Sequence, residues 1–172
     1  MTITTIDPGF FPDENAAGWF EEHFAGRVPL DLRGEAASLS WSDFSASYGP
    51  CGGPLRLGQW AGDDDERLVA ARGPQLRIFR GVLAFGDRIG TATATASGPV
   101  AALTAMLYER GVPVEVLKFH QLSSGARTAT FILAGDGTRI QWSMCVAEDS
   151  TLSALRALIT CANRLLAARD PA

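Results

Sequence analysis

The sequence predicts an α+β fold built from two similar β-β-β-α units, with antiparallel sheets packed against helices and a helical arm at the N-terminus. From residue 54 onward, strand-like stretches and helices follow each other in the order strand, strand, strand, helix, and this order occurs twice. Arg88-Ile89 recurs as Arg139-Ile140, 51 residues later, and Ala102-Leu103 recurs as Ala154-Leu155, 52 residues later. Because a unit this short hides its sheet face only against a partner, we expect the two units to pack together.

Composition is that of a folded globular protein. The chain has 172 residues, of which 47% are hydrophobic and 20% charged, so it is long enough for a domain with a true core. The net charge of −4, without a basic block, argues against nucleic-acid binding. No apolar run approaches the ~20 residues of a membrane helix, and the N-terminus lacks the pattern of a signal peptide. We therefore expect a cytoplasmic protein without membrane contact.

Residues 1–53 are predicted to form a helix followed by a connector. The helix covers about residues 13–25, with Asp13 as its N-cap, and it places Phe20 and Phe24 on one apolar stripe. The connector is rich in Ser and Gly and is expected to hold one short strand, packed down by its aromatic residues, Trp41, Phe44 and Tyr48. A partner or the protein's own sheet could bury the aromatic residues of the helix equally well.

Unit one covers about residues 54–111. Its strands are expected at 54–62, 76–85 and 88–96, and Pro99 in a first turn predicts a helix that Gly111 and Pro113 end. The buried stripe of that helix is predicted to contain Val100, Leu103, Met106 and Leu107. The acidic run at 63–66 is interpreted as a solvated hairpin turn rather than a cation site.

Unit two covers about residues 112–169. Strands are expected at 112–122, 126–134 and 139–147, the last with an alternating apolar pattern, and a long helix at 151–169 closes the unit. The alternating residues of the third strand are Ile140, Trp142, Met144 and Val146.

Residues with catalytic potential are few. The chain has two histidines, His23 and His120, and no phosphate-binding loop, nucleophile elbow or metal-ligand spacing. Its cysteines, Cys51, Cys145 and Cys161, are interpreted as reduced thiols. We therefore expect no catalytic residue, metal or cofactor.

One local feature could bind a ligand. At Ser97-Gly98-Pro99 a strand turns into a helix, and the free N–H groups and positive dipole of a helix N-terminus can hold a carboxylate. A capped strand-to-helix corner explains the same residues without a ligand.

Several segments resemble the C-terminal regulatory domain of α-isopropylmalate synthase, which the citramalate synthases share. The family's G-N-G-P turn and P-L-A-A helix start correspond to residues 96–102, its V-x-V-L-D-Y strand to 114–119, and its A-S-L-R-A-x-x-x-A-x-N-R helix to 153–164. The resemblance covers about residues 54–169, and the segment from Phe20 to Leu30 is similar to the family's preceding linker subdomain.

This resemblance implies a stand-alone regulatory domain that dimerises and binds a branched-chain amino acid such as leucine, or a related small carboxylate such as a 2-oxo acid. It also implies that the catalytic barrel is missing, so the chain is not an enzyme by itself and would need a catalytic synthase subunit as a partner. The ligand-binding residues that the resemblance implies lie on three segments: Thr95, Ala96, Ser97, Gly98, Pro99, Val100, Leu117, Phe119, His120, Ala147, Asp149 and Ser150.

Departures from the family pattern leave two other functions open. Ala94 and Ala96 stand where the family has glycines, and Lys118 puts a cation where it has a carboxylate. These changes favour a dimerisation or interaction module without a ligand. A small enzyme recruited onto the fold would need a pocket that pairs His120 with Cys145 or an acid.

Overall fold

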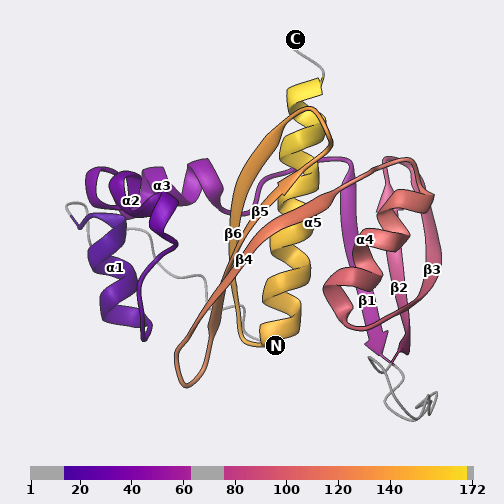
Figure 1. Cartoon of the computed structure of the whole chain (residues 1–172), viewed down its shortest axis with the longest axis horizontal. Helices are drawn as coiled ribbons and strands as arrows, with labels where there is room; N and C mark the ends of the chain where they lie inside the picture. The colour runs from indigo at the N-terminus through magenta and orange to yellow at the C-terminus, as the bar shows by residue number, and fades with distance from the viewer. Residues whose placement is uncertain (1–13, 63–75, 170–172) are drawn as a thin grey trace.

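The computed structural model describes residues 14–62 and 76–169, and within them it confirms the α+β architecture. Two three-stranded antiparallel sheets are each followed by a helix, and short helices precede the first sheet (Figure 1). Asp13 and the acidic run at 63–66 lie outside the described residues.

Unit one consists of the sheet β1-β2-β3 and the helix α4. Its elements are β1 (Leu55–Gly62), β2 (Arg77–Phe85), β3 (Arg88–Ala96) and α4 (Pro99–Glu109). A two-residue turn joins β2 to β3, and Gly86 at its first position has φ +58°, a left-handed conformation that favours glycine. Pro99 starts α4, and Gly111, with φ +78°, follows its end, as the sequence predicts.

Unit two repeats this order with the sheet β4-β5-β6 and the helix α5. Its elements are β4 (Glu115–Ser123), β5 (Thr128–Gly135), β6 (Ile140–Ala147) and α5 (Ser150–Arg169). All eight residues of the central strand β5 are buried, because both faces of this sheet are covered. The helix α5 covers one face and the N-terminal arm covers the other (Figure 1).

The two units share one hydrophobic core, as predicted from their small size. In Figure 1 the helix α5 runs through the middle of the molecule, between the sheet of unit two and the strands of unit one. Leu55 and Leu83 of unit one belong to the same buried cluster as Ile132 and Leu158 of unit two. The burial of apolar side chains from both units is therefore what holds them together.

A buried asparagine adds a polar link between the units. The Asn163 side chain of α5 accepts a hydrogen bond from the Leu55 backbone N–H at 3.0 Å and donates one to the Leu55 carbonyl at 2.9 Å. Since β1 is an edge strand, Asn163 replaces the strand neighbour that Leu55 lacks on that side. A Cβ atom on Gly53 would lie 2.3 Å from the Asn163 side chain, so the chain entering β1 passes very close to α5.

The N-terminal arm, residues 15–48, corrects two predictions. It contains α1 (Ala16–His23), a 3-10 turn (Leu30–Leu32), α2 (Arg33–Ser38) and α3 (Trp41–Tyr48), so the connector holds helices and not the expected strand. The N-cap of α1 is Asn15, whose side chain accepts a hydrogen bond from the Gly18 N–H at 2.8 Å.

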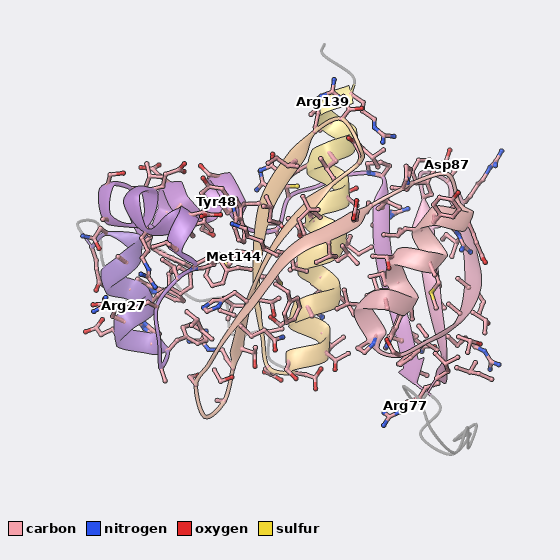
Figure 2. All side chains as sticks on the ribbon, in the orientation of Figure 1. Arg27, Tyr48, Arg77, Asp87, Arg139 and Met144 are labelled. Atoms are coloured by element: carbon pink, nitrogen blue, oxygen red, sulfur yellow. The ribbon has the colours of Figure 1, made fainter. Side chains whose placement is uncertain are left out.

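The protein's own sheet buries the aromatic residues of the arm. Phe20 and Phe44 are fully buried in a cluster that includes Phe131 of β5 and Met144 of β6. Figure 2 shows Met144 on the side of the sheet that faces the arm. The alternation predicted for the third strand of unit two holds for Trp142, Met144 and Val146, which pack under the arm, whereas Ile140 at the start of the strand is 65% exposed.

Arg164 of α5 holds the end of the arm. Its guanidinium donates hydrogen bonds to the carbonyls of Ala46 at 3.1 Å and Gly49 at 2.7 Å, which end α3. These carbonyls have no partner within their own helix, so the cation next to them satisfies the helix C-terminus. In the described part of the chain, no helix has the length and hydropathy needed to cross a membrane.

Candidate functional site

A pocket of about 720 Å³ lies where the two units meet, between the N-termini of α4 and α5. Unit one contributes the predicted turn and the first turns of α4, through residues 97–101 and Thr104. Unit two contributes residues from the chain entering β4, from β4 and from the start of α5: Val114, Glu115, Val116, Phe119, Gln121, Ser150, Thr151 and Ala154. The start of α5 lies about 50 residues after the turn before α4 in the sequence, and the duplicated fold brings the two together.

The start of α4 offers free hydrogen-bond donors to this pocket. The first N–H bonded within the helix is that of Ala102, which donates to the Gly98 carbonyl at 3.0 Å. The N-cap Gly98 makes no side-chain cap, so the N–H groups of Val100 and Ala101 donate to no described residue. They lie at the positive end of the helix dipole, which favours an anionic group.

The start of α5 contributes a second helix N-terminus. Asp149 caps it, because its carboxylate accepts a hydrogen bond from the Leu152 N–H at 2.8 Å and its carbonyl accepts one from the Ser153 N–H at 2.9 Å. The N–H groups of Ser150 and Thr151 remain open within the described chain. The negative charge of Asp149 offsets part of the α5 dipole, so α4 is the stronger anion site of the two.

The charged and amide side chains of the pocket suit a cation better than an anion. Among the described residues of the lining, Glu115 is the one ionisable side chain, and none is a Lys, Arg or His. Gln121 Nε2 donates to Thr130 Oγ1 at 3.0 Å and to the Ser150 carbonyl at 3.1 Å. Its side-chain oxygen is left to accept a hydrogen bond, and together with the Glu115 carboxylate it could receive an ammonium group.

Half of the predicted site residues line the pocket. These are Ser97, Gly98, Pro99, Val100, Phe119 and Ser150. The other six do not: Thr95 is exposed on β3, Ala96 and Ala147 are buried, Leu117 and His120 lie elsewhere on β4, and Asp149 caps α5.

A β-bulge decides which residues of β4 face the pocket. Val116 pairs with Ala134 and Lys118 with Leu133, so Leu117 is an extra residue without a partner on β5. The bulge places Val116 and Phe119 on the pocket side of β4 and leaves Leu117 47% exposed outside it.

Lys118 and His120 face the arm instead of the pocket. Lys118 Nζ forms an ion pair with Asp31 Oδ2 of the arm at 2.5 Å. The His120 ring bonds through Nε2 to the Arg27 carbonyl at 2.9 Å, and because a carbonyl only accepts, Nε2 carries the proton. The cation of Lys118 therefore lies outside this pocket.

Comparison with curated proteins finds relatives of this chain among the 2-isopropylmalate synthases. The chain is 33% identical over 140 residues to a 2-isopropylmalate synthase from Parafrankia sp., covering 78% of this chain and 24% of the relative. It is 30% identical over 147 residues to one from Renibacterium salmoninarum, covering 82% of this chain and 24% of the relative. The chain is related to a part of 2-isopropylmalate synthase.

The resemblance stated from the sequence is thereby confirmed at the level of a partial match. A third 2-isopropylmalate synthase, from Arthrobacter sp., is 37% identical over 78 residues, covering 43% of this chain and 14% of the relative. The chain thus spans a quarter or less of the length of these synthases. No family model matches the chain.

The alanines that replace the synthase family's glycines leave the pocket open. Ala96 is buried in the shared core, and Ala94 packs against that core. Neither residue lines the pocket, so their methyl groups do not block a ligand at the α4 N-terminus.

The two buried cysteines, Cys145 and Cys161, form no catalytic pair with His120. Burial raises the pKa of the Cys145 thiol to about 11 and that of Cys161 to about 11, so both remain protonated near neutral pH. Cys145 belongs to the core shared with α5, whereas His120 faces the arm on the other side of the sheet. In the described ranges, no three His, Cys, Asp or Glu residues gather as a metal site would require.

Eight residues of the lining were not among the predicted site residues: Ala101, Thr104, Val114, Glu115, Val116, Gln121, Thr151 and Ala154. Helical spacing points to two of them, because Thr104 follows Val100 by four residues and Ala154 follows Ser150 by four. Strand alternation points to Gln121, two residues after Phe119.

Proposed function

We propose that this chain is a regulatory-type domain that binds a branched-chain amino acid, leucine-like, or a related small carboxylate in the pocket between α4 and α5. The observation that carries the proposal is the meeting of two helix N-termini at one pocket with apolar walls. The relationship to a part of 2-isopropylmalate synthase, whose regulatory domain the sequence resembles, supports the same function.

Each part of the proposed ligand would meet a different group of the lining. The carboxylate would accept hydrogen bonds from the N–H groups of Val100 and Ala101, with those of Ser150 and Thr151 nearby. The ammonium would meet Glu115 and the side-chain oxygen of Gln121. The branched side chain would pack on apolar atoms of the lining, which come from Val100, Val116 and Phe119.

Glu115 is expected to give amino acids a higher affinity for the pocket than 2-oxo acids. A 2-oxo acid of the same shape has no ammonium to pair with the carboxylate, and it brings a second oxygen acceptor to a pocket that already holds one acid. Leucine is therefore expected to bind more tightly than its 2-oxo acid.

Substitution of Val100 by glutamate tests the site. The new carboxylate would stand at the α4 N-terminus and repel the ligand carboxylate there, so we expect the affinity for leucine in isothermal titration calorimetry to fall at least tenfold. An acidic residue in the first turn of a helix does not destabilise it, so circular dichroism should remain unchanged.

Tyr108→Glu serves as the matched control. It adds the same charge to the same helix at a residue that is 72% exposed and outside the pocket lining. We expect its affinity for leucine to equal that of the wild type. If V100E binds leucine as tightly as Y108E does, the ligand lies elsewhere.

A dimerisation module that partners a separate catalytic subunit is the second candidate function. Leu117 is 47% exposed and Ile140 is 65% exposed, and both lie within 4 Å of the position that a Cβ atom on Gly135 would occupy. Apolar side chains gathered in this way on a surface are typical of protein contacts. If titration calorimetry detects no heat of binding with leucine, isoleucine, valine or their 2-oxo acids, the result would favour a dimerisation module over ligand binding.

A further inference from the structure

The strand β4 lies between the pocket and the arm. Phe119 and Gln121 belong to the pocket lining, whereas Lys118, His120 and Leu122 contact the arm. Because successive residues of a strand point to opposite faces, any shift of β4 changes both sets of contacts at once.

Three contacts hold the arm alongside β4. The Ala25 N–H donates to the Ser123 carbonyl at 3.1 Å, His120 Nε2–H donates to the Arg27 carbonyl at 2.9 Å, and Lys118 pairs with Asp31. Residue numbers rise along the arm while they fall along β4, so residues 25–31 run antiparallel to the strand. A Cβ atom on Gly26, which has φ +108°, would lie 3.0 Å from Leu122 Cδ2, so the arm backbone passes close to the strand.

The position of β4 is set by few other contacts. It lies at the edge of its sheet, where β5 is its one neighbouring strand in the described structure, and its ladder with β5 is interrupted by the bulge at Leu117. On the pocket side, Gln121 links it to the first residue of α5 through the Ser150 carbonyl. A ligand beside Phe119 and Gln121 would therefore act on the most exposed strand of this sheet.

We infer that occupancy of the pocket is coupled to the seating of residues 25–31 on β4. This inference rests on the proposed function. A ligand that packs on Phe119 and bonds to Gln121 holds β4 in one position, and the arm then keeps its contacts on the opposite face more of the time. Coupling between two sites is reciprocal. If ligand binding favours the seated arm by a given factor, seating of the arm raises the ligand affinity by the same factor, and loosening the arm lowers that affinity.

Lys118→Met tests the reciprocal effect. It removes the ion pair with Asp31 but keeps the aliphatic stem, and it does not line the pocket. In calorimetry of the full chain, we expect leucine to bind about threefold more weakly to K118M than to the wild type. Arg169→Met is the matched control, because it removes the ion pair of Arg169 with Asp136 at the other end of α5 and should leave the affinity unchanged.

Hydrogen exchange of the wild type tests the direct effect. Saturating leucine should slow the amide exchange of residues 24–31 at least threefold, whereas residues 41–48 of the arm, which have no hydrogen bond to β4, should change less.

The possible outcomes distinguish a failure of this inference from a failure of the proposed function. If leucine binds the wild type, and K118M and R169M bind it equally while exchange at 24–31 is unchanged, the coupling is wrong and the proposed function stands. If no branched-chain amino acid or 2-oxo acid binds the wild type, both are wrong. Weaker binding to K118M alone, with slower exchange at 24–31, supports the coupling.

Discussion

Phe20→Ala is expected to lower the free energy of unfolding by about 3–5 kcal/mol, the usual cost of truncating a buried phenylalanine. Phe20 is fully buried, and its ring contacts those of Trp41, Phe44 and Phe131 at centroid distances of 5.3, 5.8 and 5.2 Å. Alanine would leave a cavity at the point where the arm meets the sheet of unit two. Urea denaturation followed by tryptophan fluorescence measures the loss.

Tyr108→Ala provides the comparison for this variant. Tyr108 is an aromatic residue that is 72% exposed, so its truncation removes little buried surface and should cost less than about 1 kcal/mol. If F20A costs no more than Y108A, the arm does not form part of the folded core, and the burial of its aromatic residues against the sheet would be contradicted.

Asn163→Ala should lower the free energy of unfolding by about 3 kcal/mol. The variant leaves both the N–H and the carbonyl of Leu55 without their side-chain partners, and an unpaired buried polar group costs about 1–3 kcal/mol. The small cavity left beside Gly53 adds to that loss. Thermal and urea unfolding both measure the effect.

Thr160→Ala is the matched control for Asn163. Both residues are buried polar positions of α5, but within the described chain Thr160 has no side-chain hydrogen bond to lose. We expect T160A to cost about 1 kcal/mol. Equal losses in the two variants would mean that the Asn163 hydrogen bonds do not hold unit one against α5.

Most of the fold could be predicted because its signals are local. Alternation and turn residues place β3 at the predicted bounds, and Pro99 and Gly111 enclose α4 as expected. The helices of the connector were missed because they are only six and eight residues long and rich in Ser. One signal for α3 was present: Ser40 is its N-cap, with the Asp43 N–H donating to Ser40 Oγ at 3.1 Å and the Ser40 hydroxyl donating to Asp43 Oδ2 at 3.0 Å.

The site was predictable in unit one and only partly in unit two. The free donors at the α4 N-terminus follow from a strand, a turn and Pro99, all adjacent in the sequence. The pocket face of β4 depends on the bulge at Leu117, which shifts the alternation by one residue. No local signal marks that bulge, so a strict period of two groups Leu117 with Phe119 and puts Val116 on the wrong face.

The proposed pocket is tested most directly by mapping amide chemical shifts in a two-dimensional ¹H–¹⁵N spectrum during titration with leucine. We expect saturable shifts centred on the amides of Val100, Ala101, Ser150 and Thr151, because their N–H groups are open donors at the two helix N-termini. Absence of shifts at saturating leucine, or saturable shifts confined to residues outside the lining, would contradict it.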